Sequence, residues 1–221
     1  MVAIGHDEAS SHEPENQKLI NGLTERGYLP VTADQRATFD LEAEGNYVTK
    51  PLPQGTVILE LINSKTPDAK TRFAAALHRS EFVLYGGHGR YGSGPDFDDI
   101  RSPSGNFVIG APYEPGHVTL GANDLVAAPL SSEYQLMFFD GCNTFRYFDD
   151  LRAKKSTASL DVIGSNTELY WNVTAANLLA MLDGVSEQQS LEQLETSLDA
   201  VNRAGPDDQH TYFRGDGFED N

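Results

Sequence analysis

The sequence predicts an α/β fold in which a mainly parallel central sheet is flanked by helices on both faces. Short continuous apolar runs at residues 82–85 and 136–139 are bounded by turn residues, which is typical of strands buried on both faces of a parallel sheet, and residues 56–62, TVILELI, predict another strand. Helical patterns alternate with the strand patterns, as in βαβ units. No internal repeat or linker interrupts the chain, so one domain is expected over residues 1–204.

The expected elements follow one another along the chain. We expect strands at residues 2–4, 28–32, 56–62, 82–85, 136–139 and 159–164. We expect helices at residues 15–26, 66–80, 145–154, 172–182 and 190–202. Apolar residues three or four positions apart define the helical faces, as Leu191 and Leu194 do in the last helix. Gly27 ends the first helix as a C-cap, and Thr66-Pro67 fits the N-cap and first residue of the second.

Three segments are expected to be irregular or accessory. Residues 33–55 contain prolines and several acidic residues, which predicts a long connection with little regular structure. Residues 90–106 are rich in Gly, Ser, Pro and Asp and predict a loop, after which short apolar pieces at 107–110 and 117–120 fit a β-hairpin insertion. Pro, Asp and Gly dominate residues 205–221, and we expect a disordered acidic tail there.

The chain is strongly acidic. It has 221 residues, with 33 Asp and Glu against 16 Lys and Arg, and its formal net charge is −17. Phosphate contacts need Lys and Arg, so we expect no nucleic acid partner, and an anionic membrane is disfavoured for the same reason. Electrostatic steering favours a basic substrate or partner, although acidity can also serve solubility alone.

We expect neither a targeting segment nor a membrane-spanning segment in this sequence. No apolar window approaches the length of a membrane span. The first residues, MVAIGHDE, lack the basic and long apolar regions of a signal peptide. We therefore expect a cytoplasmic location, with a domain excised from a longer secreted protein as the alternative. The oligomeric state is left open.

The single cysteine directly follows a buried strand. Cys142 comes after the run 136–139 and Asp140-Gly141, at the carboxyl end of a strand, where open α/β sheets build their sites. A free cysteine is also one of the most buried residue types, so Cys142 could simply be a packing residue. His88 favours the functional reading, because it follows another apolar run and two glycines. A thiol and an imidazole are the pair that a cysteine nucleophile requires.

Five loops are expected to meet at one edge of the sheet. In a parallel sheet, every loop that follows a strand reaches the same edge. The loops concerned are residues 6–15, 63–67, 86–91, 141–145 and 165–171. Residues that are far apart in the sequence are therefore expected to form one site.

The order and spacing of the two motifs resemble the caspase–haemoglobinase group of cysteine peptidases, which includes caspases, legumains, gingipains, clostripain, separase and CHAT domains. The motifs are an apolar run before Gly-His88-Gly89 and an apolar run before Gly-Cys142, separated by 142 − 88 = 54 residues. In caspases this gap is about 50 residues. The sequence Cys142-Asn-Thr is similar to the CHAT pattern, and the caspase Gln-Ala-Cys-x-Gly signature is missing, so the flanks resemble gingipain-like and CHAT-like bacterial members most. The resemblance covers about residues 56–183.

The resemblance implies a caspase–haemoglobinase-like fold and a cysteine endopeptidase that acts on a peptide or protein substrate through an acyl-enzyme. Cys142 would attack the scissile carbonyl, and His88 would protonate the leaving amine and later activate water. The N–H groups of Gly89 and Cys142 would form the oxyanion hole. Two alternatives stay open: a catalytically inactive binding module of the same fold, and a thiol hydrolase or acyltransferase on small molecules.

The acidic loops at the expected active edge suggest a pocket for a basic residue before the cleaved bond. We rank Glu168 and Asp96 as the pocket acids, with Tyr170 and Trp171 as a flat wall. A buried carboxylate without a partner gains most from a substrate cation, and Arg offers bidentate geometry. Arg90 could instead favour an acidic residue.

Cofactors and metals play no part in the expected mechanism. No cofactor motif is present, and no metal site is expected. A calcium ion is the one alternative, because Asp96, Asp98 and Asp99 lie in one loop, although that loop lacks the EF-hand pattern.

Two electrostatic expectations concern the catalytic pair. Asp140 could orient His88, although a carboxylate at its own strand end more simply caps the turn that follows. A His88 imidazolium beside Cys142 would lower the pKa of the thiol.

Overall fold

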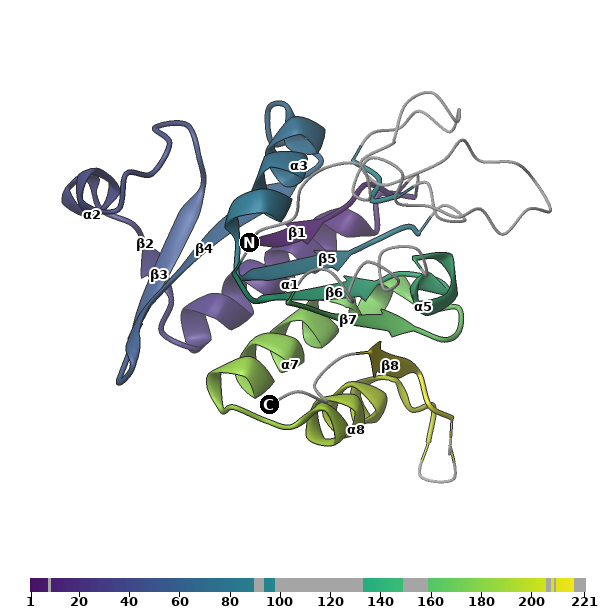
Figure 1. Ribbon diagram of the computed structural model, residues 1–221. Helices are drawn as coiled ribbons and strands as arrows, with labels where there is room; N and C mark the ends of the chain where they lie inside the picture. Colours follow the sequence, from purple (N-terminus) through teal and green to yellow (C-terminus); the bar gives the residue numbers. More distant parts are fainter. Residues whose placement is uncertain are drawn as a thin grey trace.

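The computed structural model describes residues 1–7, 9–89, 94–97, 133–148, 159–205, 208 and 210–216. Its strands are β1 (Val2–Ile4), β2 (Leu29–Pro30), β3 (Tyr47–Leu52), β4 (Gly55–Asn63), β5 (Phe82–Gly86), β6 (Gln135–Asp140), β7 (Leu160–Ser165) and β8 (Phe213–Asp216). Its helices are α1 (His12–Glu25), α2 (Ala33–Thr38), α3 (Ala69–Arg79), α5 (Thr144–Tyr147), the 3-10 helix η3 (Trp171–Val173), α7 (Thr174–Ser186) and α8 (Leu191–Asn202). In the described part of the chain, the strands form one eight-stranded sheet in the order β2-β3-β4-β1-β5-β6-β7-β8 (Figure 1). The predicted α/β fold is confirmed.

Five neighbouring strands at the centre of the sheet are parallel. β1 pairs with β4 and β5, β5 pairs with β6, and β6 pairs with β7, all in parallel. β3 and β8 pair antiparallel with β4 and β7, so the sheet is mixed only toward its two margins. Because the central strands share one direction, the loops that follow them reach the same edge, as the sequence predicted.

Strand β6 shows how both faces of the sheet are covered. All of its residues are buried. Leu136 and Phe138 belong to the core cluster built with α1, α7 and α8, whereas Met137 and Phe139 belong to the cluster built with α3. Figure 1 shows these helices on opposite sides of the sheet. Successive side chains of a strand point to opposite faces, so a strand covered on both faces requires a continuous apolar run.

The segment at residues 33–55 is more regular than the sequence predicted, and that prediction is wrong. The Thr32 hydroxyl accepts a hydrogen bond from the Gln35 N–H, and the Gln35 side chain accepts one from the Thr32 N–H. This complete capping box starts α2. β3 then pairs with β4 from Tyr47 to Leu52 and satisfies the backbone groups on the side of β4 that faces away from β1.

The tail is partly ordered, so the disorder predicted for residues 205–221 is wrong for the part that forms β8. Phe213 is fully buried, and its ring centroid lies 5.3 Å from that of Phe138. Asp199 Oδ1 accepts hydrogen bonds from the N–H groups of Tyr212 and Phe213. One aromatic anchor and one carboxylate on α8 therefore order a segment whose composition alone favours disorder.

Some predicted helix bounds differ from the observed ones, and some predicted elements fall on residues that the structure does not describe. α3 begins at Ala69 instead of Pro67, and its N-cap is Asp68, whose φ of 53° is left-handed. The expected hairpin at residues 107–120 lies outside the described residues, and the helix expected at 145–154 is described only as α5. None of the helices that the structure describes is long and apolar enough to cross a membrane.

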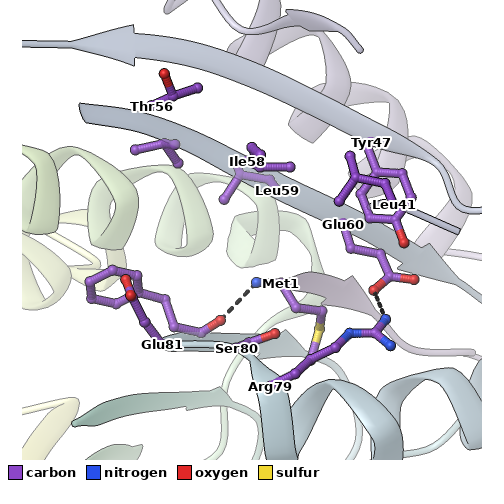
Figure 2. A pocket seen from close by; sticks show the side chains of 12 residues that line it. Met1, Leu41, Tyr47, Thr56, Ile58, Leu59, Glu60, Arg79, Ser80 and Glu81 are labelled. Carbon is purple, nitrogen blue, oxygen red and sulfur yellow. Dashed lines mark hydrogen bonds and ion pairs between the residues drawn. The ribbon is translucent and has the colours of Figure 1, made fainter. Parts of the chain in front are cut away.

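A buried carboxylate joins β4 to α3. Glu60 is 6% exposed, and its two oxygens each lie 2.5 Å from an arginine of α3, Arg72 and Arg79. Figure 2 shows the contact with Arg79. Glu42 pairs with the same two arginines from the surface. Because an unpaired buried charge is costly, this network holds α3 against the sheet only while Glu60 stays ionised.

We expect Glu60→Gln to lower the free energy of unfolding by about 1–3 kcal/mol, since it removes the buried charge but leaves Glu42 to pair with the arginines. Urea unfolding monitored by circular dichroism measures the loss. Glu44→Gln is the matched control, because Glu44 is exposed, and its change should stay within about 0.5 kcal/mol. Equal stability of the two variants would contradict a structural role for the Glu60 network.

Candidate active site

His88 and Cys142 lie at the same height on neighbouring parallel strands. Gly86 of β5 is the register partner of Asp140 of β6. His88 follows Gly86 by 88 − 86 = 2 residues, and Cys142 follows Asp140 by 142 − 140 = 2 residues. Both side chains line one cavity of about 140 Å³ at the carboxyl edge of the sheet. The described residues that line it are Gly87, His88, Asp140, Gly141, Cys142, Leu169, Tyr170, Trp171 and Thr174.

Two glycines let the turns after β5 and β6 touch. A Cβ atom on Gly141 would lie 2.4 Å from the carbonyl oxygen of Gly87, a distance that no side chain could tolerate. A Cβ atom on Gly89 would lie 3.0 Å from the carbonyl oxygen of Cys142. The backbone of Gly89 is thus adjacent to the carbonyl of Cys142, and the absence of a side chain on Gly89 allows this close approach.

The turn that presents Cys142 is fastened to the end of β7. Asn143 has a left-handed φ of 55°, and its N–H donates to the carbonyl of Thr167 at 2.9 Å. The Thr144 hydroxyl donates to the carbonyl of Phe139 at 2.6 Å and accepts from the Ser165 N–H at 3.0 Å. These bonds fix the position of the cysteine backbone without using the thiol.

His88 contacts a carboxylate and an indole. Its Nε2 lies 3.5 Å from Oδ1 of Asp7, a nearly buried residue in the loop after β1. Asp7 is itself held by the N–H of Ser11, which donates to its other oxygen at 3.0 Å. The ring of Trp171 stands edge-on to the imidazole, with centroids 5.3 Å apart. Asp7 is therefore the carboxylate that can orient His88, a role for which the sequence suggested Asp140 as one possibility.

The pKa of the Cys142 thiol is raised above its ordinary value, the opposite direction to the one expected for a thiol beside a His88 imidazolium. Burial raises the pKa of the thiol most. A backbone hydrogen bond with Leu169 lowers it, and the negative charges of Glu168 and Asp140 raise it further. The site therefore does not start from a thiolate–imidazolium pair.

Asp140 is the buried acid of the cavity. It is 2% exposed, and its Oδ1 accepts a hydrogen bond from the Asn177 amide at 3.0 Å. Its Oδ2 has no hydrogen-bond partner among the described residues. Burial raises the pKa of this carboxyl to about 7, whereas Asn177 and the nearby Thr174 hydroxyl lower it and the charge of Glu15 raises it.

The structure brings only some of the predicted specificity residues to the cavity. Tyr170 and Trp171 line it, and Tyr170 is 82% exposed. Glu168 is exposed and acts on the thiol through its charge, but it does not line the cavity. Asp96 is buried beside β1 and β5, where its N–H donates to the Tyr85 hydroxyl. Asp140 thus takes the position of pocket acid that the sequence suggested for Glu168 and Asp96.

The remaining predicted residues give no metal site in the described ranges. No group of three or more His, Cys, Asp or Glu side chains there is arranged to hold a metal ion. The calcium alternative depends on Asp98 and Asp99, which lie outside the described residues, as does Arg90. The loop of Asp96 is therefore not assigned a ligand.

A larger cavity, of about 420 Å³, lies at the opposite edge of the sheet (Figure 2). Its wall includes Leu41, Tyr47 and Phe82, and its charged side chains are Glu81 and the ion pair of Glu60 with Arg79. None of the described residues that line it is a histidine or a cysteine. The smaller cavity is therefore the better candidate for chemistry.

Comparison with known proteins identifies no relative: no family model, no curated protein and no solved structure matches the chain. The chemistry of the site follows from its residues alone. A thiol and an imidazole beside a carboxylate line or border the same cavity, and such groups can serve nucleophilic catalysis.

We expect Gly141→Ala to disrupt the site, because the added methyl group would force the β5 and β6 turns apart. The expected result is a loss of about 2 kcal/mol or more in unfolding free energy, together with altered Cys142 reactivity. Gly205→Ala is the control, because a Cβ atom there meets no other atom within 4 Å. If Gly141→Ala were as stable as Gly205→Ala, the contact between the turns would not be essential.

We expect alkylation of Cys142 by iodoacetamide to reach half its maximal rate above pH 8.5, the usual thiol value, because burial and two carboxylates oppose the thiolate. Glu168→Gln should move the midpoint to lower pH. The exposed Glu192 of α8 provides the control Glu192→Gln, which should leave it unchanged. Mass spectrometry at a series of pH values measures the rate, and a midpoint below pH 7 would show a resting thiolate instead.

Proposed function

We propose that this protein is a cysteine endopeptidase that hydrolyses peptide bonds with the pair His88 and Cys142. The observation that carries the proposal is the register of β5 and β6, which delivers an imidazole and a thiol to one cavity. Asp7 beside His88 supports it, because an oriented imidazole is the usual partner of a catalytic thiol. The resemblance of the two motifs to caspase–haemoglobinase peptidases supports peptide substrates.

Proton transfer from the thiol has to accompany the attack, because the resting thiol is protonated. In the proposed step His88 accepts the proton of Cys142, while Asp7, whose Oδ1 lies 3.5 Å from Nε2, orients the imidazole. The sulfur then bonds to the scissile carbonyl carbon, and the backbone N–H groups of Gly89 and Cys142 stabilise the oxyanion. The imidazolium gives its proton to the leaving amine, and a water activated by His88 hydrolyses the acyl-enzyme.

A basic side chain before the cleaved bond is the preferred occupant of the cavity. Asp140 supplies a buried carboxyl oxygen that has no hydrogen-bond partner among the described residues, and such a group gains most from a cation. Tyr170 and Trp171 provide flat apolar walls for the side-chain stem. Only Oδ2 of Asp140 is free, since Asn177 occupies Oδ1, so Arg cannot use both oxygens equally and should gain little over Lys.

Fluorogenic peptides that place Arg, Lys, Asp, Asn or Leu before the reporter group test the proposal. We expect cleavage after Arg and Lys, with rates within about tenfold of each other. Cys142→Ala and His88→Ala should each reduce kcat/KM by at least about 10³-fold without changing the circular dichroism spectrum. A peptidyl acyloxymethyl ketone should add one label per chain, on Cys142.

The outcomes separate the alternatives. Unchanged turnover in Cys142→Ala would refute the thiol mechanism altogether. No labelling and no cleavage of any peptide would indicate a catalytically inactive binding module. Labelling of Cys142 with activity only on small thioesters would indicate a thiol hydrolase. Cleavage after Asp or Leu would refute the basic pocket and leave the mechanism standing.

A further inference from the structure

Asp140 lies in an environment with few compensating charges. It packs against helices from two different parts of the chain: α7 contributes the neutral Asn177 and Thr174, and α1 contributes Glu15. Glu15 is buried, its charge opposes ionisation of Asp140, and it is paired with Lys18. Among the described residues, the other titratable side chains that line the same cavity are His88, Cys142 and Tyr170.

Asp140 belongs to the cavity wall and carries a buried oxygen without a hydrogen-bond partner among the described residues. That oxygen is Oδ2, and Asp140 lines the cavity with Cys142 and Trp171. A ligand that enters past the exposed Tyr170 therefore meets a carboxyl group that water and protein solvate poorly. Under these conditions a neutral carboxylic acid is the stable form of the empty site, and a carboxylate becomes stable only beside a cation.

We propose that a cation entering this cavity displaces the proton of Asp140, so that recognition of a basic side chain is coupled to proton release and strengthens as the pH rises. The inference rests on the proposed function, because it takes the cavity as the pocket for the residue before the cleaved bond. In the binding step, the Asp140 carboxyl loses one proton to solvent and the carboxylate pairs with the ligand cation. No other bond changes.

The direction of the pH effect follows from the protonation state of the empty site. Burial raises the pKa of Asp140 to about 7, so at pH 5 the carboxyl is neutral and each bound cation must expel a proton. Affinity should then rise by roughly tenfold per pH unit below this pKa and level off above it. A neutral ligand of the same shape expels no proton, and its affinity should not depend on pH.

The test uses butylguanidine, which stays charged at every pH of interest, and butylurea, its neutral isostere. Binding is measured between pH 5 and 9 by the fluorescence of Trp171, the only tryptophan of the chain and part of the cavity wall. The full chain carries Cys142→Ala, which removes the thiol as a source of protons. We expect butylguanidine to bind at least about tenfold more tightly at pH 7 than at pH 5. Butylurea should bind weakly at every pH.

Asp140→Asn identifies the group that releases the proton. In this variant butylguanidine should lose its preference over butylurea and its pH dependence. If Asp140→Asn does not fold, Glu15→Gln serves instead, because it removes the neighbouring charge and should move the midpoint of the pH dependence to lower pH. Gln retains an oxygen for the Ala175 N–H that Glu15 now binds.

Three results would overturn the inference. Butylguanidine affinity that is constant from pH 5 to 9 would show that Asp140 is already ionised in the empty cavity, while leaving the basic pocket intact. A pH dependence that persists in Asp140→Asn would assign the proton to His88. Equal affinity for butylguanidine and butylurea would refute the basic pocket itself, and labelling of Cys142 would still report separately on the catalytic pair.

Discussion

The site depends on the contact between the turns that follow β5 and β6. The parallel register places Gly86 beside Asp140, so His88 and Cys142 come at the same distance beyond their strands. The turns can meet only because Gly141 carries no side chain against the carbonyl of Gly87. The cavity, the cysteine turn and the approach of Gly89 to Cys142 all follow from this contact. Everything else in the fold, from the helices on the two faces to β3 and β8 at the margins, supports the two strands that bring it about.

The sequence predicted the parts of the molecule that depend on local pattern. Continuous apolar runs identify strands such as β6 because burial on both faces leaves no place for polar residues. The sequence did not predict the parts that depend on contacts with residues far away in the chain. β8 is ordered by Phe138 and Asp199, and its own composition gives little sign of this. The positions of His88 and Cys142 followed from strand ends, but the roles of Asp7 and Asp140 did not. Asp7 lies beside His88, which follows a different strand, and Asp140 is buried with one oxygen that has no hydrogen-bond partner among the described residues. Neither fact can be deduced from the residues that flank Asp7 or Asp140 in the sequence.

The buried environment of the cavity disfavours ionisation of two neighbouring acids, the Cys142 thiol and the Asp140 carboxyl. Burial favours the protonated forms of both the Cys142 thiol and the Asp140 carboxyl, and the charge of Asp140 makes thiolate formation harder still. In the proposed peptidase, a cation would replace the proton of Asp140, so the thiol would face an ion pair of zero net charge in place of a neutral carboxylic acid.

The central position of β1 has a consequence for how the chain acquires this site. Val2–Ile4 are inserted between Leu61–Asn63 of β4 and Leu84–Gly86 of β5, so the earliest residues of the chain pair with partners about 60 and 80 positions later. Contacts of such long range close large loops and slow folding. A nascent chain cannot bury β1 before β5 has been synthesised, and Asp7 cannot reach His88 until then. In the proposed peptidase, His88 would therefore lie beside Asp7 only once β1 has paired with β5.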